Sequence, residues 1–224
     1  MTTIDIIGAW TPRPQSLDDV TTATAKMLHD MPALPGLWVT TPGDSSGDDG
    51  DPQRFTALDL NAHADLAARI LAATAEVKNM KNPGQYATIR RRTEQGKFPL
   101  SLRIRAGFAK PRNRIIASLR LDEVTSAASQ RLIRAVMAAV IGAWNPDWLK
   151  AGTYEVQKQQ GHSHGPVIIG WDTYISDRID FDDTAIDGRL ATVHGAAGRY
   201  VTLDGTPAEP SLEQAQLVRA ALGY

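Results

Sequence analysis

Histidine is the side chain best suited to acid–base and metal chemistry near neutral pH, and this chain has five histidines. His162 and His164 are one residue apart and lie between glycines in a polar segment. Two imidazoles can bind zinc or copper, but a zinc site needs three or four ligands. No further histidine or carboxylate cluster stands at ligand spacing. The pattern therefore favours a polar loop and no metal, with a small metal-dependent hydrolase around this pair as an alternative.

Other catalytic patterns are missing from the sequence. Without cysteine, thiol nucleophiles, thiolate zinc sites and disulfides are excluded. The sequence contains no G-x-S-x-G nucleophile motif, no Walker A loop and no G-x-G-x-x-G opening a helix. We therefore predict a protein that is not an enzyme, holds no cofactor and works by binding another protein.

Charge supplies the best candidates for a contact surface. The 24 basic and 25 acidic side chains leave a net charge of −1, but they are unevenly distributed. The segment from 177 to 187 is acidic and lacks the glycine and terminal glutamate of a calcium loop. A second acidic run lies at 44–51. The candidate contact residues are Asp177, Asp180, Asp182 and Asp183, then Asp44, Asp48, Asp49 and Asp51.

A basic segment, residues 90–114, has the opposite character. It carries nine lysines and arginines against one acid, Glu94. Such a segment could neutralise phosphates, so a nucleic-acid-binding protein is the other alternative. Only Phe98 and Phe108 interleave with the charges, which is too few for a base-stacking platform. Arg103 and Arg105 alternate with apolar residues, so we expect them on the outer face of a hairpin.

Apolar periodicity places these segments on a regular framework. The length suits one domain, 1–224, whose core needs neither disulfide nor metal. Strands are predicted at 3–10, 37–41, 100–108, 114–121, 167–176, 190–194 and 200–203. Helices are predicted at about 16–31, 61–77, 126–144 and from 211 onward. The order β-α-β-α-β-β-α-β-β-β-α predicts an α+β or α/β fold, with a mixed or largely antiparallel sheet and about four helices packed on it.

Two further expectations concern mobility and location. Residues 42–54 (PGDSSGDDGDPQR) contain turn formers and charges without apolar periodicity, which predicts an exposed, flexible loop. The N-terminus (MTTIDIIGAW) lacks the features of a signal peptide, and no apolar run approaches the roughly 20 residues that span a bilayer. We therefore expect a cytoplasmic protein with no membrane partner.

Three short motifs together resemble the Immunity protein 52 family. Gly8-Ala9-Trp10 with Arg13 and Ser16-Leu17 resembles its opening. Trp144-Asn145-Pro146-Asp147-Trp148 resembles its W-x-P-D-W ending of a long helix, and Gly170-Trp171-Asp172-Thr173-Tyr174-Ile175 resembles its G-W-x-x-Y-L strand. The motif residues are Gly8, Trp10, Arg13, Trp144, Pro146, Asp147, Trp148, Gly170, Trp171 and Tyr174.

The resemblance implies a function as well as a fold. Members of that family are antitoxins of bacterial polymorphic toxin systems, typically paired with a nuclease toxin of restriction-endonuclease-like fold. The chain would then neutralise a cognate toxin in the producing cell. Glycine, proline and tryptophan at strand and helix ends are packing devices, so we expect the motif residues to hold the fold and the surface loops to carry specificity.

Overall fold

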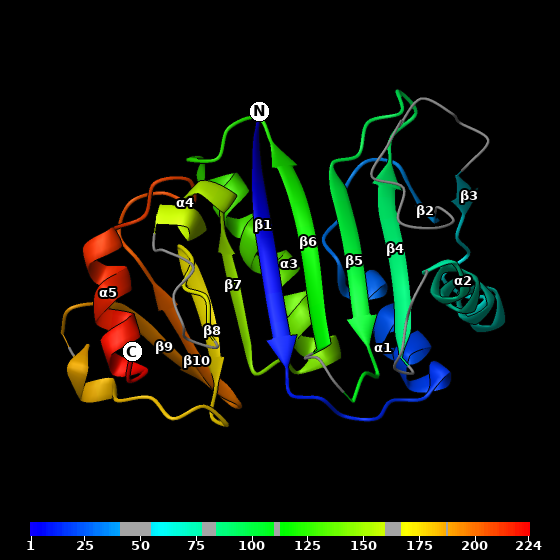
Figure 1. Cartoon of the computed structure of the whole chain (residues 1–224). Helices are drawn as coiled ribbons and strands as arrows, with labels where there is room; N and C mark the ends of the chain where they lie inside the picture. The colour runs from blue at the N-terminus through cyan, green and yellow to red at the C-terminus, as the bar shows by residue number, and fades with distance from the viewer. Residues whose placement is uncertain (41–54, 78–83, 110–112, 160–166, 187) are drawn as a thin grey trace.

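The computed structural model describes residues 1–40, 55–77, 84–109, 113–159, 167–186 and 188–224. One sheet runs through this part of the chain, and the two ends of its strand order are β3 and β9 (Figure 1). The strands are β1 (Thr2–Trp10), β2 (Leu37–Thr40), β3 (Thr56–Ala57), β4 (Gln85–Arg92), β5 (Leu100–Ala106), β6 (Asn113–Leu121), β7 (Trp148–Gly152), β8 (Asp172–Ser176), β9 (Ala191–Gly195) and β10 (Gly198–Thr202). The helices are α1 (Leu17–Asp30), α2 (His63–Glu76), α3 (Ala127–Trp144), α4 (Tyr154–Gln159), α5 (Leu212–Ala221) and the 3-10 turn η2 (Asp183–Ala185).

The sheet has ten strands in the order β3-β2-β4-β5-β6-β1-β7-β8-β10-β9, and every neighbouring pair is antiparallel. This confirms the α+β class and the largely antiparallel sheet. The centre is built from alternating sequences, because successive side chains of a strand point to opposite faces. In β5 and β6 the apolar positions are buried, while the arginines and serines between them lie on the other face.

One face of the sheet is covered by helices. In the view of Figure 1, α1 and α3 lie behind the central strands. A capping box at Ser16 and Asp19 starts α1, and the side chain of Ser126 caps α3. Val20, Met27, Val136 and Val140 from these two helices are fully buried against the sheet. This layer forms the main hydrophobic core.

The described residues cover only part of the width of the opposite face. Ile7 and Ala9 of β1 alternate with the residues of the main core and belong to a second cluster with Val201 and Val218. Helix α5 and the segment before β8 supply much of this second layer. Over β4, β5 and β6 the same face carries arginines in place of an apolar layer. The arginines of these three strands therefore gather beside the second apolar layer.

Two expectations about the elements need correction, and a third is untested. Strands β3, β4 and β7 and the short helix α4 were not predicted. The arginine run 90–92 obscured the alternation of β4, and Lys150 obscured that of β7. The strand predicted at 167–176 begins only at Asp172, and the preceding residues pack as an irregular segment. The loop predicted at 42–54 lies outside the described residues. No described helix combines the length and apolar character that a membrane crossing requires.

Candidate functional site

The first and second motifs meet at the end of α3. The rings of Trp10 and Trp144 stack with centroids 5.3 Å apart. The Arg13 guanidinium lies 5.8 Å from the Trp10 ring and donates a 2.7 Å hydrogen bond to the carbonyl of Trp144. Both tryptophans are 1% exposed, so the contact lies inside the main core. These residues join β1 to the C-terminus of the long helix.

Asp147 and Arg178 complete this joint. One carboxylate oxygen of Asp147 accepts from the backbone N–H of Thr11 at 2.6 Å, and the other accepts from Nε of Arg178 at 2.9 Å. The Nη2 group of Arg178 also donates to the carbonyls of Asn145 and Pro146. Arg178 is the one base inside the acidic segment. Because its guanidinium binds Asp147 and two carbonyls of the turn after α3, it does not pair with the acids beside it in the sequence.

The remaining motif residues pack in the two cores. Trp148 belongs to the second cluster, and Trp171 lies under Arg134, whose guanidinium is 4.9 Å from the ring centre. The hydroxyl of Tyr174 donates to the carbonyl of Ala197 at 2.9 Å. A Cβ on Gly170 would collide with the backbone of Ala151, so only glycine allows this close approach. Gly8 is similarly crowded by Leu149 and Trp148.

The acidic segment forms an exposed turn between β8 and η2. Arg199 bridges Asp177 at 3.6 Å and Asp183 at 2.7 Å, which partly neutralises both. Asp182 caps η2 and accepts from Thr184, which lowers the pKa of its carboxyl group. Neither Asp180 nor Asp182 has a basic partner among the residues described here. These two carboxylates are the ones open to a contact.

Other candidates from the sequence lie outside the described residues. These are Asp44, Asp48, Asp49 and Asp51 of the second acidic run, and the pair His162 and His164. Within the part of the chain that is described, no three histidine or acidic side chains gather in a way that could hold a metal ion. The structure therefore places only the first acidic group, the turn 177–183.

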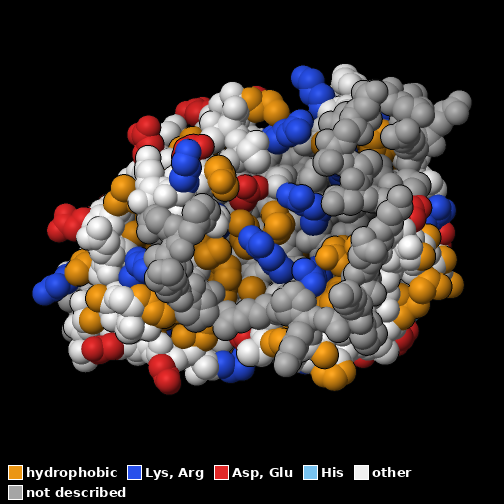
Figure 2. Space-filling view, in the orientation of Figure 1, with side chains coloured by type: hydrophobic (Ala, Val, Ile, Leu, Met, Phe, Trp, Pro, Cys, Tyr) orange, Lys and Arg blue, Asp and Glu red, His pale blue; other side chains and the backbone are white. Residues whose placement is uncertain are grey.

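Three arginines of the basic segment share one face of the sheet with Lys150. We call these four residues the basic face: Arg103 and Arg105 of β5, Arg114 of β6 and Lys150 of β7. Cross-strand register aligns these residues. Arg105 of β5 lies opposite Arg114 of β6. Arg103 of β5 and Lys150 of β7 lie in one row across the sheet, because Ile116 of β6 and Ile7 of β1 are the paired residues between them. In the orientation of Figure 1, the space-filling view shows basic side chains gathered in a central hollow (Figure 2).

Lys150 is the most unusual member of this face. Its side chain is among the largest fully buried ones, with 1% of the residue exposed. Burial, and to a lesser degree Arg114, lower the pKa of its ammonium group to about 8, although Asp5 acts in the opposite direction. Burial and Arg103 likewise lower the pKa of Arg114. These cations therefore lie close enough for each to disfavour the charged form of its neighbour.

Sequence reasoning identified the arginines but missed Lys150 and Arg178. Lys150 is in a short strand that the sequence did not reveal, and Arg178 was counted only as a minor charge in an acidic run. The flanking sequence Trp148-Leu149-Lys150-Ala151 carries one weak signal, a lone cation between apolar residues. The ammonium group of such a lysine must either reach solvent or be buried, and burial of the charge lowers the stability of the fold.

Comparisons with known proteins bear on the fold alone. No family model matches the chain, and no curated protein matches it. A solved structure of the Pseudomonas aeruginosa T6SS protein PA0821 is similar, with a TM-score of 0.56 and 9% sequence identity. The similarity covers 98% of this chain and 75% of that protein. The two chains therefore share an architecture over nearly the whole length of this one.

Proposed function

We propose that this chain is an immunity protein that binds and neutralises a cognate secreted toxin. The observation that carries the proposal is the fold it shares, over 98% of its length, with a T6SS protein. Secretion systems of that type are a context in which an antitoxin is needed. The resemblance of the three motifs to an immunity family points the same way and adds a nuclease as the kind of toxin.

In such a protein we expect some residues to support the fold and others to contact the toxin. The motif residues lie in the cores and in the joint after α3, where they hold the frame. The acidic turn 177–183 is exposed next to that joint, and Arg178 fixes its start. A nuclease carries a cationic cleft for phosphate, so an exposed anionic turn on a rigid frame can dock there and gain association rate by electrostatic steering.

The experiment uses the toxin encoded next to this chain. Co-expression of the chain should protect cells from that toxin, and the purified pair should associate. Changing Asp180→Asn and Asp182→Asn together removes the two open charges, and the amide oxygen of an asparagine can still accept the capping hydrogen bond at the start of η2. The association rate should fall by about threefold to tenfold at low salt and by less at high salt.

A matched control removes two charges elsewhere. Asp122→Asn with Glu123→Gln changes two exposed acids after β6 and should leave the association rate within about twofold. If the chain neither binds nor protects against the neighbouring toxin, the immunity function is wrong. If protection persists and the two double variants behave alike, the function stands and the toxin docks elsewhere.

One observation keeps nucleic-acid binding as a second candidate, because the arginines of the basic segment do converge on one face. The aromatic rings on that side are already covered by arginines. Arg105 lies over Tyr86 and Phe108, and Arg90 lies over Phe98. Those ring faces are therefore not open to bases. Steeply salt-dependent binding to generic DNA would favour this candidate.

A further inference from the structure

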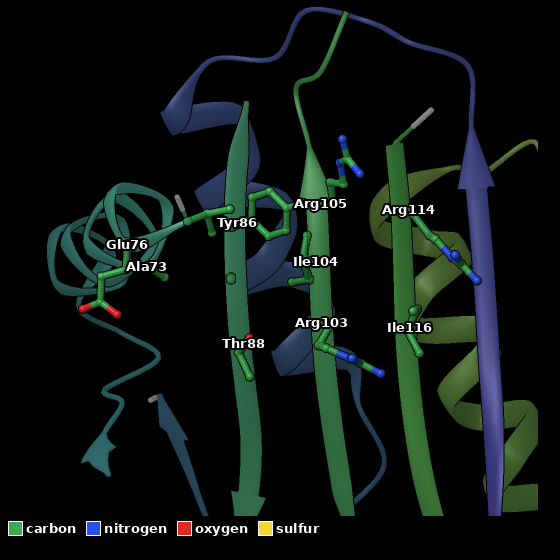
Figure 3. A pocket seen from close by; sticks show the side chains of 11 residues that line it. Ala73, Glu76, Tyr86, Thr88, Arg103, Ile104, Arg105, Arg114 and Ile116 are labelled. Atoms are coloured by element: carbon green, nitrogen blue, oxygen red, sulfur yellow. The ribbon is translucent and has the colours of Figure 1, made fainter. Parts of the chain in front are cut away.

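The basic face contains a hollow of about 420 Å³ beside α2. Its walls include Tyr86, Thr88, Arg103, Arg105, Arg114 and Ile116. Figure 3 shows Arg103 extending from β5 toward β6, Arg114 extending from β6 toward β1, and Glu76 of α2 pointing away from both. The hollow therefore presents guanidinium groups above a partly apolar floor.

The cations around this hollow lack counter-charges. Arg103 has no hydrogen bond or ion pair with any described residue, and Nε of Arg105 is buried without a partner. Asp5 is the acid that faces Arg114 and Lys150, and one of its oxygens already accepts from Ser118 at 2.7 Å. Glu76 also lines the hollow but points away from Arg103 and Arg114 (Figure 3), so the nearby carboxylates balance only part of the positive charge.

Lys150 provides the second, independent observation. It is 1% exposed, and no described residue accepts a hydrogen bond from its ammonium group. An ammonium has three donors. Nζ of Lys150 is not among the fully buried polar atoms without a partner, so this donor group lies at the surface while the rest of the side chain is buried. Its lowered pKa of about 8 still leaves the group mostly charged at neutral pH. A bound anion would supply both the missing acceptor and the missing charge.

We infer that the basic face binds a small ligand bearing two or more phosphate or carboxylate groups. Arg103 and Arg114 hold one oxyanion through their planar guanidinium forks, and Arg105 borders the same hollow and attracts the other. Lys150 does not line the hollow, but it lies near Arg114 and adds to the positive field there. The volume of the hollow suits a small molecule, and its floor at Ile116 can accept an apolar portion. The inference goes beyond toxin neutralisation and does not depend on it.

The test titrates the intact protein with pyrophosphate and, separately, with citrate at low salt, using calorimetry. We expect at least one to bind with a dissociation constant of about 1 mM or tighter. The variant Arg103→Gln with Arg114→Gln should weaken that binding by about tenfold or more. Pyrophosphate alone binding identifies a phosphate ligand, citrate alone a carboxylate ligand, and both support the site.

A control variant removes the same charge away from the hollow. Arg120→Gln with Arg131→Gln changes one arginine at the far end of β6 and one on α3, and both are exposed. Binding should stay within about twofold. Equal weakening in both variants would show diffuse attraction to positive charge and would overturn the proposal.

A measurement on the unmodified protein covers the case in which the arginine variant does not fold. The Lys150 ammonium, assigned by comparison with Lys150→Met, should titrate at higher pH when the anion is bound. No binding of either anion at about 10 mM, or no shift of the Lys150 titration, would contradict the site. Tight binding of a single-stranded oligonucleotide without binding of either small anion would replace it with nucleic-acid recognition.

Discussion

At the scale of single residues, this protein buries side chains of two different kinds. Trp10 and Trp144 are apolar surfaces that the core requires, and their stacking ties β1 to α3. Lys150 is the reverse case, a charged side chain that is almost wholly buried. The tryptophans stabilise the fold, whereas the buried lysine costs stability. Removing a tryptophan should therefore lower the free energy of unfolding, and replacing the lysine by an apolar residue should raise it.

Trp144→Ala should destabilise the protein by about 3–5 kcal/mol, because it empties a fully buried indole site between Trp10 and Met27. Trp171→Ala should act similarly under Arg134. Urea unfolding of each variant measures the loss, with Trp144→Phe as the milder control. Soluble alanine variants of unchanged stability that no longer bind a partner would instead identify these rings as interface anchors.

Lys150 should make stability rise with pH. Its pKa falls from 10.5 to about 8 on folding, so the unfolded chain binds more protons between these two values. The destabilisation is fully present below pH 8 and is relieved as the pH approaches 10.5. The full effect is about 3 kcal/mol. Unfolding curves at about pH 7 and about pH 9.5 should therefore differ less for Lys150→Met than for the unmodified chain.

Lys150→Met should also be more stable than the unmodified chain at neutral pH, since it buries no charge. Equal pH dependence in the two proteins would show that the ammonium of Lys150 reaches water. Comparing the two proteins at each pH cancels the contribution of the other groups that titrate in this range.

At the scale of elements, the turn from α3 into β7 organises one end of the molecule. Asn145 ends α3 in the left-handed region, with φ 43°, and Pro146 follows it. Asparagine tolerates this conformation better than other side-chain-bearing residues do. The turn then presents three acceptors, one of them the Asn145 side chain, to Arg178. The helix end and the start of the acidic turn are thereby fixed together.

Asn145→Ala should cost about 1–2 kcal/mol, because alanine is strained at positive φ and cannot accept from Arg178. Asn145→Gly should cost less, since glycine adopts this conformation freely and loses only the side-chain hydrogen bond. Thermal or urea unfolding of the pair measures the difference. An alanine variant at least as stable as the glycine variant would contradict the role of the left-handed turn.

At the scale of the whole molecule, one broad antiparallel sheet carries helices behind its central strands on one face and a second apolar layer over part of the other, among the described residues. Figure 1 shows the two layers, and Figure 2 shows the charged hollow on the partly covered side. The two apolar clusters meet across β1, whose residues alternate between them. Stability then rests on packing along this strand, which has a long neighbour in β6.

We predict that the fold needs no metal ion. Its buried residues form apolar clusters on both faces of the sheet, which is a sufficient source of stability for a chain of this length. Thermal melting with and without a strong chelator should coincide. A fall in the melting temperature of more than about 4 °C in the chelator would contradict this, because it corresponds to roughly 1 kcal/mol or more for a chain this size.

The sequence by itself determined the elements whose signals are local. Alternation in 100–108 and 114–121 predicted β5 and β6. The helices predicted from about 16, 126 and 211 begin at residues whose side chains do cap them, Ser16, Ser126 and Ser211. The fold class followed from the order of these elements. Helix caps and periodicity depend on residues within a few positions of one another, so they can be recognised without knowing the rest of the fold.

Only the tertiary structure decided which distant residues meet. Arg178 binds Asp147, which lies 31 positions away in the sequence. The one base of the acidic segment therefore does not neutralise the acids beside it. Lys150 joins Arg103 and Arg114 through the register of β7, β1, β6 and β5. Register between strands far apart in the chain is set when both faces of the whole sheet pack, and no single segment contains that information.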